Sequence, residues 1–174
     1  MKVGILTISD KGSQGLRTDT SGPALSRYLS EREMEIAHYK IVPDEEDVIA
    51  ATLIEWADKS DLDFILTTGG TGLSPRDVTP EATIRIVERL IPGIGELMRI
   101  RSLEKTPMAA LSRAVAGVRS KTLIINLPGS PRGAVENLEA VWTVIFHAVA
   151  KIQGDQTDCA MVHHSENSHA KEIH

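Results

Sequence analysis

The stretch DFILTTGGTGLSPRDVTPEA, residues 63–82, decides how the rest of the chain is interpreted. It opens with a short apolar run, residues 64–66, which is typical of a buried parallel strand. Three glycines follow within residues 69–72, and because glycine has no Cβ, such a loop can bring backbone N–H groups close to an anion. Residues 79–81, Thr-Pro-Glu, then predict a helix start with a hydroxyl N-cap, a proline and an acid in the first turn. Strand, glycine loop and helix start together predict an anion site at the carboxyl end of a parallel sheet.

Composition limits the classes of function. A chain of 174 residues, 41% of them hydrophobic, is long enough for one domain with a sizeable core. The net charge of −5 and the 3% of aromatic residues argue against nucleic acid as a partner. Cys159 is the only cysteine, which excludes an internal disulfide and a metal site built on cysteine pairs. The N-terminus has no leader pattern and no apolar segment approaches the ~20 residues that span a bilayer, so we expect a cytoplasmic protein without a membrane partner.

Hydrophobic periodicity predicts alternating strands and helices, and therefore an α/β fold with a mostly parallel sheet. Strands are expected over residues 2–8, 35–42, 64–66, 114–118 and 122–126. Helices are expected over residues 22–33, 81–90, 94–102 and 132–152, after Asp44, and as a short turn over 106–111. The three residues between the last two strands indicate a hairpin, so one strand should be antiparallel to the rest. Residues 9–21 are expected to form a loop beside the ligand crevice.

The chain divides by character near its end. Residues 1–154 are expected to form one domain, and residues 155–174 a polar tail that holds four of the six histidines. The spacing of His163, His164, His169 and His174 is not that of a zinc protease site, and we interpret the tail as a solvated extension.

Two acids are the strongest candidates for chemistry. Asp44 and Asp77 both lie just beyond the carboxyl ends of predicted strands, which share one edge in a doubly wound sheet. A pair of acids that faces a polyphosphate commonly holds Mg²⁺. The alternatives are structural: Asp44 is also placed to cap the following helix, and Asp77 to pair with its neighbour Arg76.

Two further segments offer groups suited to phosphate. Ser112 and Arg113 precede a predicted strand, and the segment NLPGSPR, residues 126–132, follows the last one. Each offers a hydroxyl and a guanidinium, although loop polarity alone would also produce them. The chain lacks the patterns G-x-x-x-x-G-K-[ST], G-x-G-x-x-G and G-x-S-x-G, which argues against a P-loop, a dinucleotide-binding domain and a serine hydrolase.

The chain resembles the molybdopterin adenylyltransferases of molybdenum cofactor synthesis, of MogA/MoaB type, whose domain also occurs at the N-terminus of gephyrin. The matching segments are ILTISD (5–10), TSGPAL (20–25), VPDEE (42–46), TTGGTGLSPRDVTPEAT (67–83), LSRAVAG (111–117) and NLPGSPRGA (126–134). They cover residues 2–153 in the family's order, and the fourth is the most specific. The chain is of the short type, without an insertion before the last helix that some members carry.

The resemblance implies a three-layer α/β sandwich, a homotrimer and the Mg²⁺-dependent transfer of AMP from ATP to molybdopterin with release of pyrophosphate. It places the two important acids at Asp44 and Asp77, which also makes them the candidate Mg²⁺ ligands. The expected substrate-binding residues are Ser9, Asp10, Gly69, Gly70, Thr71, Gly72, Arg76, Thr79, Ser112, Arg113, Pro128, Gly129 and Ser130, with Ser112 on the pterin side. The product would pass to a molybdenum-inserting protein. The alternative is a non-catalytic molybdopterin-binding or scaffold protein of the same fold.

Overall fold

A six-stranded sheet forms the centre of the molecule. The computed structural model describes residues 1–155, and the strands lie in the order β2-β1-β3-β6-β5-β4. The strands are β1 (Lys2–Ile8), β2 (Glu35–Val42), β3 (Phe64–Thr68), β4 (Arg89–Leu90), β5 (Ala116–Arg119) and β6 (Thr122–Leu127). The helices are α1 (Asp10–Ser13), α2 (Ser21–Ser30), α3 (Glu46–Lys59), α4 (Thr79–Ile86), α5 (Pro92–Leu103), α6 (Pro131–Ile152) and the 3₁₀ helix η1 (Pro107–Leu111).

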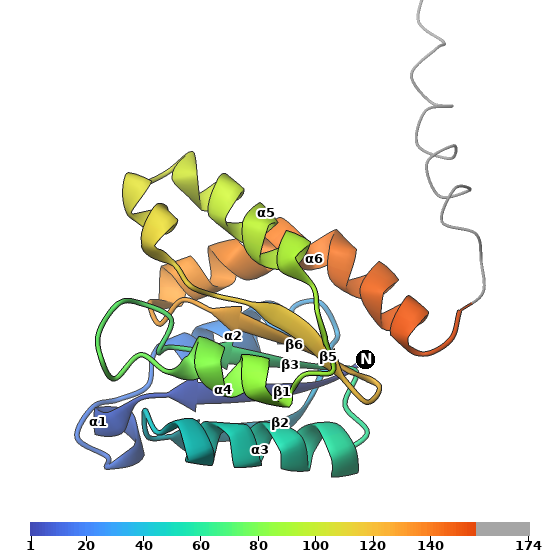
Figure 1. The fold of residues 1–174 in the computed structure, drawn as a ribbon, viewed down its shortest axis with the longest axis horizontal. Helices are drawn as coiled ribbons and strands as arrows, with labels where there is room; N and C mark the ends of the chain where they lie inside the picture. The colour runs from blue at the N-terminus through green and yellow to red at the C-terminus, as the bar shows by residue number, and fades with distance from the viewer. Residues whose placement is uncertain (156–174) are drawn as a thin grey trace, which may run out of the picture.

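Helices cover both faces of the sheet, so the predicted three-layer α/β sandwich is confirmed. On one face, α2, α5 and α6 pack against β1, β3 and β6 through a cluster that includes Leu25, Met98 and Leu138. On the other face, α3 and α4 pack through a second cluster that includes Leu53, Trp56 and Ile86. Figure 1 shows the two helical layers above and below the strands. Because both faces are covered, every residue of β3 and β6 is buried, as the apolar runs predict.

The sheet is parallel except at one end. β1 pairs in parallel with β2 and β3, and β3 with β6, whereas β5 runs antiparallel to β6 and to β4. The predicted hairpin and the one antiparallel strand are therefore confirmed. The tight turn of the β5–β6 hairpin contains Ser120, whose φ of 53° lies in the left-handed region.

The helix predicted over residues 81–90 begins within its predicted start at residues 79–81 but ends four residues early. α4 begins at Thr79 and ends at Ile86, and Val87 is extended with a ψ of 144°. The backbone N–H groups of Glu88 and Ile91 then donate to the carbonyls of Val118 and Ala116, which makes residues 89–90 the edge strand β4. The apolar spacing of Val87 and Leu90 fits a helix, but hydrogen bonds to β5 decide the conformation.

Two smaller differences concern the segments before α2 and after α6. The predicted loop over residues 9–21 begins with the single helical turn α1, capped by the Ser9 hydroxyl, which accepts from the N–H of Gly12. The predicted tail lies outside the described residues apart from Asp155. Among residues 1–155, no helix is long and apolar enough to cross a membrane.

Candidate active site

The carboxyl ends of four parallel strands meet at one edge of the sheet. The chain passes from β1 outward to β2 and then returns to β3 on the other side of β1, so the loops after β1 and β3 diverge and leave a crevice. A cavity of about 470 Å³ occupies this position. It is lined by Thr7, Ile8, Ser9, Gly12, residues 17–21, Asp44, Thr68, Gly69, Gly70, Asp77, Gly129, Ser130 and Pro131.

The glycine loop lies against the end of β1 so closely that side chains are excluded. A Cβ on Gly69 would lie 2.3 Å from the carbonyl oxygen of Ile8, and the φ of Gly69 is 104°. A Cβ on Gly70, whose φ is 63°, would lie 2.3 Å from Oγ1 of Thr79. The need for glycine at these two positions is therefore steric as well as conformational.

Thr79 supports this loop from beneath. The predicted role of its hydroxyl as N-cap is wrong, because the N-cap is Val78 and Thr79 is already helical. The fully buried hydroxyl donates to the carbonyl of Gly69 at 2.9 Å, and the Thr79 N–H donates to the carbonyl of Gly70 at 3.1 Å. Thr79 thus holds the loop in shape and does not line the cavity.

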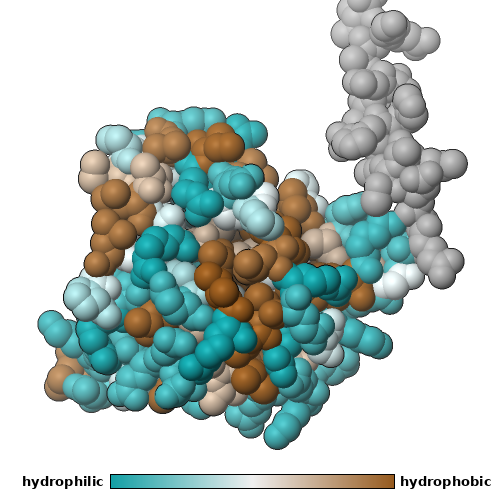
Figure 2. Space-filling view, viewed as in Figure 1, coloured by the Kyte–Doolittle hydropathy of each residue, from teal (hydrophilic) through white to brown (hydrophobic). Residues whose placement is uncertain are grey.

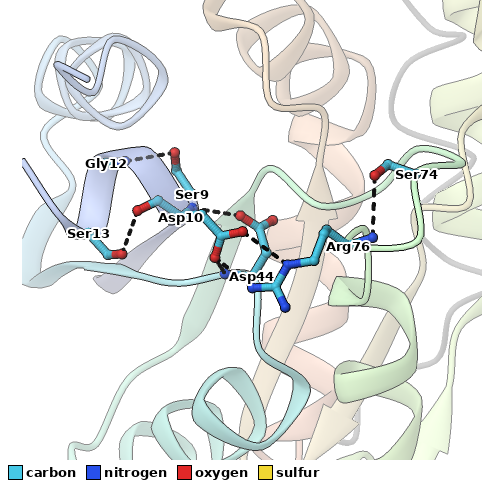
Figure 3. Close-up of polar contacts among 7 residues, drawn as sticks. All are labelled: Ser9, Asp10, Gly12, Ser13, Asp44, Ser74 and Arg76. Atoms are coloured by element: carbon cyan, nitrogen blue, oxygen red, sulfur yellow. Dashed lines mark hydrogen bonds and ion pairs between the residues drawn. The ribbon is translucent and has the colours of Figure 1, made fainter. Parts of the chain in front are cut away.

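Asp44 is held by the segment that follows β1. The N–H of Asp10 donates to Oδ2 of Asp44 at 2.7 Å, and the N–H of Asp44 donates to Oδ1 of Asp10 at 3.0 Å (Figure 3). The predicted capping of α3 by Asp44 is therefore wrong: the N-cap is Glu45, which makes no side-chain cap bond. Partial burial raises the pKa of Asp44, and the charges of Asp10 and Asp77 add to this effect.

Arg76 pairs with Asp10. Its Nε and Nη2 donate to Oδ2 and Oδ1 of Asp10 at 3.0 and 2.7 Å (Figure 3). This bidentate pair lowers the pKa of Asp10. The alternative role of Asp77 as the partner of Arg76 is thus wrong, and the side chain of Asp77 accepts instead from the N–H of Ser74 at 2.7 Å.

Asp44 and Asp77 come together at the glycine loop. Both line the 470 Å³ cavity, and a Cβ on Gly70 would lie 3.4 Å from Oδ1 of Asp44 while one on Gly72 would lie 3.0 Å from Oδ2 of Asp77. Two carboxylates, a loop of backbone N–H groups and room for a ligand fit Mg²⁺, which binds through one or two carboxylates and phosphate oxygens. No cluster of three or more His, Cys, Asp or Glu within residues 1–155 forms a cage for a metal ion without a ligand.

Arg113 holds the far side of the loop. Its Nε donates to the carbonyl of Gly72 at 2.7 Å, its Nη2 donates to the carbonyl of Asp77, and its Nη1 pairs with Glu81. The predicted guanidinium for phosphate is thus occupied within the protein. Arg113 instead joins the segment before β5 to the glycine loop and to α4.

A second cavity of about 310 Å³ adjoins the first. It contains five of the predicted residues, Thr71, Gly72, Ser112, Pro128 and Ser130, and is also lined by α5, η1 and the start of α6. Ser130 lines both cavities and caps α6, with its hydroxyl accepting from the N–H of Gly133. The N-terminus of a 22-residue helix, with no acid in its first turn, therefore lies where the two cavities meet.

Residues 17–21 form a wall of the larger cavity, as expected for the loop over residues 9–21, although none of these five residues was predicted individually as a site residue. Asp19 organises it: the hydroxyls of Thr7 and Tyr39 donate to Oδ2 at 2.6 and 2.5 Å. The N–H groups of Ser21 and Gly22 donate to Oδ1 at 2.9 and 3.1 Å. Burial alone would raise the pKa of Asp19, but the hydrogen bonds to its carboxylate lower it. Burial and the hydrogen bond to Asp19 together raise the pKa of Tyr39 to about 12. An acid two residues before a helix start is the signal that would have identified Asp19.

Comparisons with known proteins identify the family of this chain. Residues 4–147 match a family described as a probable molybdopterin binding domain. The molybdopterin adenylyltransferase of Helicobacter pylori strain J99 is 47% identical over 156 residues, which cover 88% of each chain. The enzyme of the same name from Escherichia coli K12 is 42% identical over 158 residues, 86% of this chain and 80% of the relative.

Solved structures give the same result. The molybdopterin biosynthesis enzyme MoaB from Thermus thermophilus superposes with a TM-score of 0.83 at 56% identity, over 88% of this chain and 97% of that one. The match of sequence and fold over most of the chain is sufficient to assign the family. This chain belongs to the molybdopterin-binding domain family.

Proposed function

We propose that this protein transfers AMP from ATP to molybdopterin in molybdenum cofactor biosynthesis. The observation that carries the proposal is the position of Asp44 and Asp77, which come from different strand ends and line one cavity beside the glycine loop. The relatives named molybdopterin adenylyltransferase at 42–47% identity support it.

The reaction is a substitution at phosphorus. An oxygen of the molybdopterin phosphate forms a bond to the α-phosphorus of ATP, and the bond from that phosphorus to the oxygen bridging to the β-phosphorus breaks. Pyrophosphate leaves with the bonding electron pair. Because the attacking phosphate is already an anion, the protein's work is alignment and charge stabilisation more than proton removal.

The two adjoining cavities suit two substrates. We assign the nucleotide phosphates to the 470 Å³ cavity with its acids and glycine loop, and the pterin to the more apolar 310 Å³ cavity with Ser112. The N–H of Gly69 donates to the carbonyl of Leu127, so it is the N–H groups of residues 70–72, together with the start of α6, that face the reacting phosphates from two sides.

Asp44 and Asp77 are the residues that would hold Mg²⁺ on the ATP phosphates. Bound there, the ion would neutralise phosphate charge and favour attack at the α-phosphorus. The elevated pKa of Asp44 fits this role. Its surroundings disfavour the charged carboxylate, and a cation beside it would stabilise that charge.

The test is incubation with Mg-ATP and molybdopterin, followed by an assay for pyrophosphate. Asp77→Asn should lower turnover by about 100-fold or more while the free energy of unfolding changes by less than ~1 kcal/mol. Asp61→Asn, at a carboxylate whose side chain is 96% exposed, is the matched control and should behave as wild type.

Three outcomes would contradict the proposal. Binding of molybdopterin without pyrophosphate release would favour a binding or scaffold protein. ATP binding that is indifferent to the pterin would favour a general nucleotide-binding protein. Normal turnover in Asp77→Asn would remove that residue from the mechanism.

The proposal also includes the oligomeric state and the cellular location. We propose a homotrimer in the cytoplasm that passes its product to a molybdenum-inserting protein. The outer edge of β4 is unpaired within the described chain, and exposed apolar side chains lie on α4, β4 and α5, namely Ile84, Leu90, Ile100 and Leu103. Figure 2 shows apolar atoms gathered between these helices, as expected of a surface that another copy covers.

A further inference from the structure

We propose that Arg17 and Thr20 form the subsite for the outer phosphates of the nucleotide, the pair that leaves as pyrophosphate. The inference rests on the proposed adenylyl transfer and adds to it a binding site for the leaving group. Both residues lie in the segment between α1 and α2 that forms one wall of the 470 Å³ cavity.

The charges around the cavity support this assignment. Among the described residues that line it, Arg17 is the only lysine or arginine, whereas Asp19, Asp44 and Asp77 contribute three carboxyl groups. A triphosphate carries more negative charge than one Mg²⁺ neutralises, so a cavity with three acids needs a further cation to retain it. Arg17 is the side chain that can supply this charge, and its guanidinium is suited to phosphate oxygens.

The other arginines near the site are already occupied. Arg76 is paired with Asp10 in bidentate fashion, and Arg113 is bound to the carbonyls of Gly72 and Asp77. Within residues 1–155, the guanidinium of Arg17 makes no ion pair or hydrogen bond. Its five N–H donors are therefore available to a ligand.

The hydroxyl of Thr20 is available for the same reason. Thr20 is the N-cap of α2, a position where a threonine hydroxyl usually binds the first turn, yet its side chain makes no cap hydrogen bond. Asp19 has taken that role, since its Oδ1 accepts from the N–H groups of Ser21 and Gly22. The hydroxyl of Thr20 is thus left free on the cavity wall.

The backbone that carries these two groups is held in place. Asp19 lies between them and is anchored by Thr7 of β1 and Tyr39 of β2. On the other side, the N–H of Arg17 donates to the carbonyl of Lys11 at 3.2 Å. A fixed backbone with free donors is the arrangement that binds a ligand without a large ordering cost.

The subsite has a defined effect on the reaction. When the bond from the α-phosphorus to the bridging oxygen breaks, negative charge accumulates on the departing pyrophosphate. Donors from Arg17 and Thr20 stabilise that charge, so they contribute to the binding of ATP and of pyrophosphate. They do not contact AMP, which lacks the outer phosphates.

The experiment compares three probes on the full chain by titration calorimetry with Mg²⁺: ATP, inorganic pyrophosphate and AMP. Arg17→Gln should weaken ATP and pyrophosphate by about tenfold or more, the usual scale for losing a charge-assisted hydrogen bond, and change AMP by less than about twofold. Arg17→Lys should recover part of the loss because the charge is kept. Lys11→Gln is the matched control: its cation lies six positions earlier in α1, is exposed and does not line the cavity.

The outcomes separate this inference from the proposed function. If wild type binds ATP and Arg17→Gln binds ATP and pyrophosphate equally well, the subsite is wrong and the proposed function stands. An equal loss for AMP, or the same loss in Lys11→Gln, also overturns it. Wild type that binds neither ATP nor pyrophosphate removes the proposed function together with the subsite. Thermal unfolding of Arg17→Gln should match wild type, since Arg17 makes no packing contact in the core.

Discussion

Gly70 is the position of the glycine loop at which a side chain is least tolerated. Gly70→Ala would place a methyl group 2.3 Å from Oγ1 of the buried Thr79, at a φ of 63° that disfavours side chains. We expect the free energy of unfolding to fall by about 1–3 kcal/mol, because either the backbone strain or the clash must be accommodated. Urea denaturation measures this change.

Gly93→Ala is the matched control. No atom lies within 4 Å of a Cβ built there, and the residue is in the first turn of α5. Its stability should be unchanged or higher by up to ~1 kcal/mol. If both variants lost stability equally, close approach at Gly70 would not be the cause.

Asp19 should make the protein sensitive to acid. Its folded-state pKa lies below the ordinary value of 3.8, so its stabilising effect is present above that value and is lost as the pH falls through the folded pKa. Asp19→Asn should be less stable by about 1–3 kcal/mol near neutral pH, because the hydrogen bonds to its carboxylate are weakened.

The measurement is urea unfolding of both proteins at about pH 6 and about pH 3. The difference in stability between wild type and Asp19→Asn should narrow at the lower pH. A constant difference would show that the charge of Asp19 contributes nothing.

Between elements, the Asp10–Arg76 pair joins α1 to the loop before α4. The side chains are 37% and 56% exposed, so the pair contributes only ~0–1 kcal/mol to stability. Its importance is positional, since Asp10 in turn binds the backbone of Asp44. Arg76→Gln should lower turnover by about tenfold or more with little change in unfolding.

A double-mutant cycle with Asp10→Asn tests whether the two residues act as a unit. If they do, the double variant should be little slower than either single one. Additive losses would mean that Arg76 acts on the substrate independently of Asp10.

Local sequence patterns determine some elements of this fold, whereas tertiary contacts determine others. β1 and β2 could be predicted to the residue because their apolar patterns are local and bounded by polar residues. Asp44 and Asp77 could be paired because parallel strand ends share an edge. β4 could not be predicted, because its two residues form a strand only through their hydrogen bonds to β5.

The hydrogen-bond partners of the site's side chains could not be predicted from the sequence. Arg76 has an acid beside it in sequence, but it binds one that is 66 residues away. Asp44 stands two residues before α3, yet its Oδ2 accepts from the backbone N–H of Asp10 at the start of α1. In both cases the tertiary contact displaced the local partner, and only the fold determines which acid is near.

For the whole molecule, the β4 edge is the proposed contact between copies. Leu90 is 49% exposed on the edge strand β4, whose outer edge is unpaired within the described residues, and Leu90→Asp would place a charge in the interface. Light scattering should give three times the 18.9 kDa chain mass for wild type and a lower mass for the variant. Ala51→Asp on the exposed side of α3 is the control and should leave the mass unchanged.

The mass also tests the assembly itself. A wild-type mass of one chain would contradict the trimer, and an unchanged mass in Leu90→Asp would move the contact to another surface.

Ser130 and the glycine loop border both cavities, which has a thermodynamic consequence. If bound pterin changes the dissociation constant of the nucleotide by some factor, bound nucleotide must change the dissociation constant of the pterin by the same factor. The total binding free energy of the complex with both substrates is therefore the same whichever substrate binds first. Any preferred order of substrate addition is then a matter of rates.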